Sequence, residues 1–311
     1  MALLNPAPAG PPAADGDASP DRRVLLSAAE DRLDSVLALA RVAAHLGDLR
    51  RIDWSALDPP PAAALVCDDV AATERLLELG VPVVHLDSGH PQTTAGGVAP
   101  GRALVRVHRP GWLAPSGPTV RGVRPTGVLA PRRTGRSRSR SGALVMLSLW
   151  GVPEAEADGY VRGALPELVR AALERTGGCT VVVDTGLARV RAALTERPEA
   201  RVLRAADADP DALHAGAAVF LASPTLGPIA LAQARRAPLA LLAPLGTAQR
   251  ELARRVDQVL PLPSAVDPHD PGLWAPGAAT GPWHLLDPAL DDLRGAQRVA
   301  RTLRQLALAP L

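Results

Sequence analysis

Short apolar runs alternate with amphipathic stretches along most of this chain. Between residues 216 and 256, apolar runs at 217–221 and 239–242 are each followed by a stretch with helical periodicity, the first at 229–236. Both runs are short and bounded by proline or glycine, which favours strands covered on both faces of a parallel sheet. The stretch therefore predicts a βαβα unit, with a Ser-Pro-Thr-Leu-Gly-Pro loop between its first strand and the following helix.

The same alternation extends through both halves of the sequence. In the first half it predicts strands at 23–27, 63–66, 81–86 and 103–107, with helices after the first two. In the second half it predicts strands at 143–147, 179–183 and 201–203, helices at 156–175, 187–194 and 209–214, and a final amphipathic helix at 287–308. Strands that alternate with helices are typical of an α/β fold with parallel sheets. We therefore expect two doubly wound, Rossmann-like domains that face a cleft.

Loss of periodicity marks the expected boundaries. Residues 1–21 are rich in proline, alanine and glycine and lack the features of a signal peptide, so we expect a disordered tail. An amino-terminal domain is expected over 22–130, a linker over 131–142, a second domain over 143–286 and a carboxyl-terminal helix over 287–311. Arg136, Arg138 and Arg140 in the linker fit either a phosphate contact or an exposed segment. The lack of interleaved aromatic residues favours the exposed linker.

The composition limits the classes of function. With 311 residues, of which 47% are apolar, the chain can fill two cores. The formal net charge is only +2, without the excess positive charge that a nucleic-acid partner would require. No apolar run is long enough to span a membrane, so we expect a cytoplasmic protein. Cys67 and Cys179 are expected to be reduced, buried thiols.

The loop after the strand at 217–221 is the clearest candidate for ligand binding. Backbone N–H groups at a helix start, together with the hydroxyls of Ser223 and Thr225, could hold a diphosphate. A structural turn in which serine or threonine caps the helix is equally compatible with this loop. Gln249 could bind sugar hydroxyls, or it could be a solvated surface residue.

Several segments resemble GT-B glycosyltransferases, two-domain enzymes that transfer a sugar from a nucleotide diphosphate. The resemblance covers the order of elements from 143 to 256 and the segment DDVAATERLLELGVPVV of the first half. It implies an acceptor-type first domain and a nucleotide-sugar-binding second domain. The donor-binding residues that it implies are Ser148, Gly151, Ser223, Thr225, Leu226, Gly227 and Gln249.

Within that family, the chain is similar to compact actinobacterial proteins related to cytosylglucuronate synthase. That enzyme joins glucuronate from its UDP donor to cytosine. The resemblance implies a UDP-sugar as donor substrate, a small acceptor and no cofactor, and it leaves the oligomeric state open. Two departures favour the alternative of a degenerate pseudoenzyme that binds a nucleotide or a partner enzyme. Leu231 stands where the family has a ribose-binding carboxylate, and residues 28–31 replace a glycine-rich loop. Gln233, one helical step from Leu231, could substitute weakly for that carboxylate.

An inverting transferase needs a base near the acceptor. Asp87 and His90 are the favoured candidates because the Asp-Ser-Gly-His turn follows a predicted strand and would face the cleft. Glu30, Asp31 and His85 also lie at or near the ends of predicted strands and are weaker candidates for the base. Each could instead be a helix cap, a solvated carboxylate or a hydrogen-bonded core histidine. No spacing resembles a known metal-binding motif, so no metal is expected.

Overall fold

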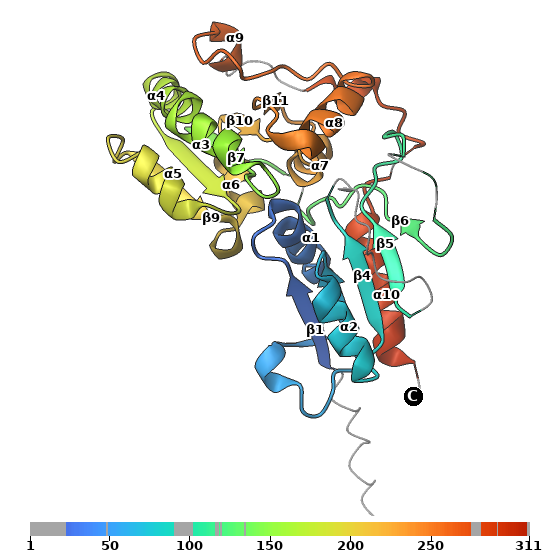
Figure 1. Cartoon of the computed structure of the whole chain (residues 1–311). Helices are drawn as coiled ribbons and strands as arrows, with labels where there is room; N and C mark the ends of the chain where they lie inside the picture. The colour runs from blue at the N-terminus through green and yellow to red at the C-terminus, as the bar shows by residue number, and fades with distance from the viewer. Residues whose placement is uncertain are drawn as a thin grey trace, which may run out of the picture.

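The computed structural model describes residues 23–47, 49–89, 102–115, 118, 120–133, 135–274, 281–290 and 292–309. Over these residues the chain forms two parallel sheets with helices packed against them (Figure 1). The expected α/β fold with two doubly wound domains is confirmed. The expected tail at 1–21 lies outside the described residues.

The first sheet has the strand order β2-β1-β3-β4-β5-β6, and all neighbouring strands are parallel. Its strands are β1 (Arg23–Ala28), β2 (Arg50–Ile52), β3 (Ala63–Cys67), β4 (Val83–Asp87), β5 (Leu104–Val107) and β6 (Arg124–Pro125). Its connections contain α1 (Leu33–Ala43), a 3-10 turn (Trp54–Ala56) and α2 (Val70–Glu78). The sequence pattern missed β2 and β6 because these edge strands are very short and mostly exposed, so they carry no apolar run.

The second sheet has the strand order β11-β10-β7-β8-β9 and is also parallel throughout. Its strands are β7 (Ala143–Leu147), β8 (Cys179–Val183), β9 (Ala200–Arg204), β10 (Val219–Ala222) and β11 (Ala240–Leu241). The helices of this half are α3 (Glu154–Arg162), α4 (Ala164–Thr176), α5 (Leu187–Ala193), α6 (Pro210–Gly216), α7 (Leu226–Ala234), α8 (Gly246–Asp257) and α9 (Pro271–Trp274). Two 3-10 turns (Ala205–Asp207 and Pro282–Leu285) and α10 (Gly295–Leu308) complete the described elements.

Three helices differ from their predicted bounds. The single helix expected at 156–175 is broken at Gly163 into α3 and α4, and the last helix begins at Gly295 rather than at 287. Helix α7 begins at Leu226 rather than at 229. The N–H groups of Leu226 and Gly227 therefore lie in its first turn, where no intrahelical acceptor is available to them.

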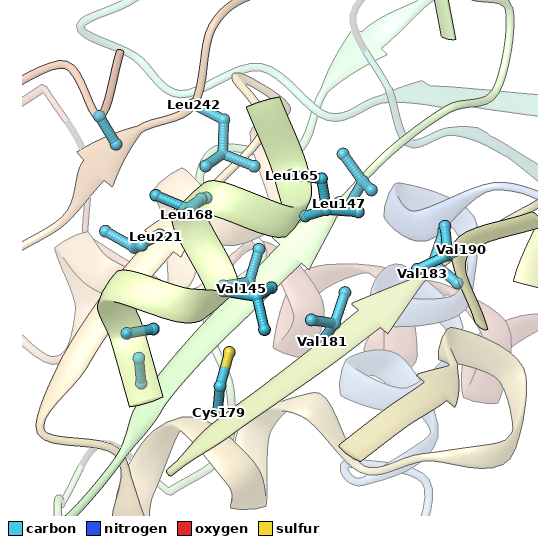
Figure 2. Close-up of a cluster of buried hydrophobic side chains, with 14 of the residues drawn as sticks. Val145, Leu147, Leu165, Leu168, Cys179, Val181, Val183, Val190, Leu221 and Leu242 are labelled. Carbon is cyan, nitrogen blue, oxygen red and sulfur yellow. The ribbon is translucent and has the colours of Figure 1, made fainter. Parts of the chain in front are cut away.

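Strand β7 is buried on both faces of its sheet. Consecutive side chains of a strand point to opposite faces, so its residues divide between two apolar clusters. Figure 2 shows Val145 and Leu147 on the face that packs against Leu165 of α4. Leu144 belongs to the cluster on the opposite face, together with Leu231 of α7. This two-sided burial accounts for the continuous apolar run that predicted the strand.

Helix α1 belongs to the first sheet but packs against the second half of the molecule (Figure 1). Its Leu33 and Leu37 are fully buried in the same cluster as α7. Arg41 is also buried, and it forms an ion pair of 2.8 Å with Asp211 of α6. Helix α10, at the end of the chain, returns to the first half and packs on α1, β3 and β4. The two halves therefore share a contact that is both apolar and charged.

The arginine-rich run in the segment expected to be a linker is only partly exposed. Arg138 and Arg140 are exposed. Arg136 is half-buried, and its Nη2 donates to the carbonyl oxygen of Ala217 at 2.7 Å. Burial, with the neighbouring charges of Arg140 and Arg235, lowers the pKa of Arg136 to about 10. Arg136 therefore differs from the other two in being anchored to the second half.

Candidate functional site

A cavity of about 140 Å³ lies between the carboxyl edges of the two sheets. Residues from both halves line it, including Arg32, Asp34, Asp68 and Asp87 from the first and Ser148, Trp150, Asp184, Thr225 and Gln249 from the second. Carboxyl edges of parallel sheets are where open α/β folds bind ligands, because loops and helix starts converge there. The cavity is therefore the candidate site.

The start of α7 holds an anion that the chain itself provides. Thr225, at the N-cap of the helix, has extended backbone and makes no side-chain cap bond. Asp34, from the first turn of α1, supplies the acceptor instead. Its Oδ1 accepts from Gly227 N at 2.7 Å, and its Oδ2 accepts from Leu226 N at 3.2 Å. A carboxylate from the first half thus occupies the helix end where a phosphate was expected.

Gly227 permits this close approach. A Cβ atom at Gly227 would lie 2.6 Å from Cδ1 of Leu37 and 2.8 Å from Oδ1 of Asp34. Gly227 was expected to bring the backbone close to a diphosphate. In this structure the neighbour that requires glycine is α1. A bulky substitution at Gly227 would therefore disturb the contact between the halves, whether or not a ligand binds.

Asp184 caps α1 in the same way from the opposite side. The N-cap residue of α1, Arg32, makes no side-chain cap bond. Leu33 N donates to Oδ2 of Asp184 at 3.3 Å. Asp184 also accepts from Ser148 Oγ at 2.6 Å and from Leu149 N at 2.9 Å. Burial raises the pKa of Asp184 despite these donors, which lower it. Each half thus supplies a carboxylate to a helix start of the other half.

The ionisation of Asp34 is strongly perturbed. Burial raises the pKa of its carboxyl from 3.8 to about 7, and the nearby charge of Asp68 adds to the rise. The hydrogen bonds from the N–H groups of Gly227 and Leu226 oppose this effect without cancelling it. Asp68, which follows β3, is itself held by bonds from Ser88 N at 2.9 Å and from two serine hydroxyls. Asp34 is therefore a carboxyl in the cavity wall whose pKa burial shifts to near neutral pH.

A cationic and an aromatic side chain face each other on the cavity wall. The guanidinium carbon of Arg32 lies 3.8 Å from the centroid of the Trp150 ring, within the range of a cation–π interaction. Arg32 comes from the first half and Trp150 from the loop after β7, so this contact also crosses the cleft.

Three of the predicted donor-binding residues bond to one another. Ser223 Oγ accepts from Ser148 N at 3.0 Å, and Gln249 Nε2 donates to the Ser148 carbonyl at 2.9 Å. Oε1 of Gln249 accepts from Leu245 N at 3.0 Å. Ser148, Thr225 and Gln249 line the cavity, whereas Ser223 is fully buried behind it. The Gln249 amide thus has backbone partners at both ends, which fixes the loops of this half.

The remaining predicted donor residues lie around the same edge. Gly151 has a positive φ of 69° in the turn after β7 and is exposed. The side chain of Leu226 is buried, and its N–H group and that of Gly227 are the groups that Asp34 covers. The N–H groups that were expected to bind a diphosphate thus hold the Asp34 carboxylate in this structure, and their role toward a diphosphate stays a prediction.

Of the two favoured candidates for the base, the structure places Asp87 at the cavity and does not describe His90. Asp87 ends β4 and lines the cavity, with its side chain half exposed. Its Oδ1 lies 3.2 Å from Nε2 of buried His85, whose Nδ1 bonds to Thr73 Oγ1 at 2.7 Å. His90 lies outside the described residues. Glu30 forms an ion pair of 3.1 Å with Arg204 across the cleft.

Neither residue considered for binding the ribose faces the cavity. Leu231 is fully buried in the core on the inner side of α7. Gln233, which could have substituted for a carboxylate, accepts a bond of 3.0 Å from Trp112 Nε1 and is also buried. Gln233 is not among the residues that line the cavity, and a core tryptophan bonds to its side-chain oxygen. Its role as a substitute ribose ligand stays a prediction.

The sequence analysis missed Asp34, Asp68 and Asp184. Asp68 and Asp184 each follow directly after a buried strand, and this signal could have found them. Asp34 lies inside a helix, where a carboxylate is commonly solvated, so the sequence gave no signal for its contact with α7. Among the described ranges, no group of three or more His, Cys, Asp or Glu side chains is placed to hold a metal ion. No helix in the described part of the chain has the length and apolarity to cross a membrane.

Several solved structures resemble the chain over about nine-tenths of its length. CalG4, the calicheamicin glycosyltransferase, is 14% identical, with a TM-score of 0.47 and coverage of 93% of this chain and 99% of CalG4. The spinosyn rhamnosyltransferase SpnG complexed with thymidine diphosphate is 15% identical, with a TM-score of 0.43 and coverage of 92% and 96%. MnaA of S. aureus with UDP is 11% identical, with a TM-score of 0.47 and coverage of 91% and 96%.

No match was found among curated proteins. The sequence does match a family profile over residues 24–311, nearly the whole chain. This protein therefore belongs to the CGA synthase-related family, as its sequence motifs predicted.

Proposed function

We propose that this protein binds a UDP-sugar in the cleft between its two halves and transfers the sugar to a small acceptor. The anion position at the start of α7 carries the proposal. There, the N–H groups of Leu226 and Gly227 hold a carboxylate at 3.2 and 2.7 Å. The same N–H groups and the positive end of the helix dipole suit a phosphate of a nucleoside diphosphate.

Binding of the donor requires the cleft to widen. The cavity of about 140 Å³ is smaller than a typical small-molecule pocket of about 300–1,000 Å³. In the widened state the diphosphate takes the place of the Asp34 carboxylate on α7. Asp34 then remains beside the reacting sugar, because α1 stays attached to the second half through Arg41 and Asp211.

Asp34 is the group that we assign as the base. Burial holds the pKa of Asp34 at about 7 only in the closed cleft. Once the donor has displaced it from α7, Asp34 is a carboxylate that can accept a proton. Asp34 takes the proton from an N–H or O–H group of the acceptor as that nitrogen or oxygen bonds to the anomeric carbon. The bond from the anomeric carbon to the diphosphate oxygen breaks, and UDP leaves with the electron pair. The start of α7 stabilises the charge that develops on the diphosphate. Asp87, which also lines the cavity, is the second candidate for the general base.

Membership of the CGA synthase-related family suggests the first substrates to test. UDP-glucuronate as donor and cytosine as acceptor are the pair that the family's name implies. In that reaction the proton would come from a ring nitrogen of cytosine, and the products would be the N-glycoside and UDP.

The test combines calorimetric titration with UDP and an assay of UDP release. We expect the wild type to bind UDP and to release it from UDP-glucuronate in the presence of cytosine. Asp34→Asn should bind UDP but lose about 100-fold or more of the turnover, the usual contribution of a general base. Asp257→Asn, at an exposed position at the end of α8, is the matched control and should keep its turnover. If neither the wild type nor Asp34→Asn binds UDP, the proposal is wrong.

A second candidate function is binding of a nucleotide or a partner enzyme without chemistry. It is favoured by Leu231, which stands where the resemblance implies a ribose-binding carboxylate and which is fully buried. Binding of UDP together with a failure to release UDP from a panel of UDP-sugars and acceptors would support this candidate over the transferase.

A further inference from the structure

The segment between β1 and α1, residues 30–34, makes a series of contacts with the second half of the molecule. Near its start, Glu30 Oε2 lies 3.1 Å from Nη2 of Arg204 at the end of β9. Next to it, the guanidinium of Arg32 lies 3.8 Å from the ring centroid of Trp150, after β7. Two contacts of different chemistry thus connect the segment to two different strands of the second sheet.

The end of the segment exchanges helix caps with the second half. Leu33 N donates to Asp184 after β8 at 3.3 Å, and Asp34 accepts from the N–H groups of Leu226 and Gly227 in α7. Neither α1 nor α7 has a side-chain cap from its own N-cap residue. A segment of five residues therefore reaches four separate positions of the second half: the end of β9, the loops after β7 and β8, and the start of α7.

We propose that residues 30–34 form an intramolecular clasp that holds the cleft shut, and that a nucleoside diphosphate enters only after the clasp is released. The second part rests on the proposed function. The first part concerns the free protein and stands without any ligand.

Competition for α7 is the physical basis of the gating. The N–H groups of Leu226 and Gly227 point to one position, and the two oxygens of the Asp34 carboxylate fill it. A phosphate that binds the same two groups must displace Asp34, since two anions at that distance repel each other. The clasp and the diphosphate therefore exclude each other.

The two halves remain connected when the clasp is released. Arg41, two turns further along α1, is buried and bonds to Asp211, to the Leu129 carbonyl at 3.0 Å and to the Gly227 carbonyl at 3.0 Å. The ion pair with Asp211 joins α1 to α6 and does not involve residues 30–34. This link between the two halves therefore persists when the clasp is released.

The charges around Asp34 set the direction of its pH dependence. Asp68 after β3, Asp87 at the end of β4 and Asp184 after β8 line the same cavity, and Arg32 comes from the clasp itself. Helix α7 contributes no charged side chain. Burial and Asp68 hold the pKa of Asp34 at about 7, so its ionised form is more stable in water than in the closed cleft. Raising the pH through 7 should therefore favour the released state.

Residue-resolved amide exchange of the ligand-free protein tests the clasp. The reporters are the N–H groups of Leu226 and Gly227, which Asp34 covers. Arg32→Ala removes a contact that does not touch α7, so a cooperative clasp predicts several-fold faster exchange at both reporters. Asp34→Ala should accelerate it about tenfold or more, the effect of losing bonds to a charged acceptor. Asp257→Ala, an exposed position at the end of α8 and outside the clasp, is the control and should leave the rates unchanged. Unchanged rates in Arg32→Ala would show that the contacts are independent and would overturn the clasp.

Titration with UDP separates the clasp from the proposed function. Faster exchange in Arg32→Ala, together with tighter UDP binding by Asp34→Ala than by the wild type, supports both parts of the proposal. Faster exchange with no UDP binding by any variant retains the clasp but overturns the diphosphate gating and the proposed function. Equal UDP affinity of Asp34→Ala and the wild type overturns the gating alone.

Discussion

Replacing Asp34 with asparagine should remove a pH dependence of folding stability. The native state holds the pKa of Asp34 at about 7, against 3.8 for an exposed aspartate, so it binds a proton that the unfolded chain has already lost. Stability is therefore highest below pH 3.8 for this group and falls as the pH rises toward 7. One pKa unit corresponds to about 1.4 kcal/mol, so the full effect of Asp34 is about 4 kcal/mol.

Urea unfolding of the wild type and of Asp34→Asn at a series of pH values measures this effect. We expect the free energy of unfolding of the wild type to fall relative to that of Asp34→Asn between about pH 4 and pH 7, and the difference to stay constant above pH 7. Asparagine can satisfy only one of the two N–H groups of α7, which subtracts about 1 kcal/mol from the variant at every pH. Asp31→Asn is the control of equal charge change and should follow the wild type. A difference between wild type and Asp34→Asn that does not vary with pH would refute the reasoning.

Three further changes test the packing around the site by thermal or urea unfolding. Gly227→Ala should lower stability by about 1–3 kcal/mol, because its Cβ would lie 2.6 Å from Leu37 Cδ1; an unchanged melting temperature would contradict the close approach of α1. Leu231→Glu should lower stability by several kcal/mol, because it buries an unpaired charge, whereas Leu231→Met should cost less than about 1.5 kcal/mol; similar losses would mean that residue 231 is not in the core. Arg136→Ser should cost about 1 kcal/mol through its lost backbone bond, whereas Arg138→Ser should change stability by less than about 0.5 kcal/mol; equal effects would remove the distinction between the two arginines.

The inner strands of both sheets could be predicted from the sequence, because burial on both faces leaves a continuous apolar run. The strand at Cys179–Val183 and the strand at Ala143–Leu147 were predicted with their observed bounds. Edge strands such as Arg50–Ile52 could not be predicted, since they have little buried surface. The start of α7 was placed three residues late because Leu226-Gly227-Pro228 has the composition of a turn; tertiary packing against α1 makes it helical.

The site was predictable only in part, for a different reason. The loop from Ser223 to Gly227 carries its own signal, since it joins a buried strand to a helix. The partner of that loop comes from a position almost two hundred residues away in the sequence, in the first turn of α1. Nothing local to Asp34 distinguishes it from a solvated helix residue. Contacts between the two halves follow from how the domains are docked, which single-sequence patterns do not encode.

Titration of UDP into the wild type, Asp34→Ala and Asp257→Ala at neutral pH tests most directly whether Asp34 competes with a phosphate for the start of α7. We expect Asp34→Ala to bind UDP about tenfold more tightly than the wild type, because the competing carboxylate is gone and the two N–H groups are free. Asp257→Ala, an exposed position at the end of α8, should bind UDP as the wild type does. Equal affinities of Asp34→Ala and the wild type would contradict the competition between Asp34 and a phosphate, and no binding by either would contradict the assignment of this helix start as the donor site.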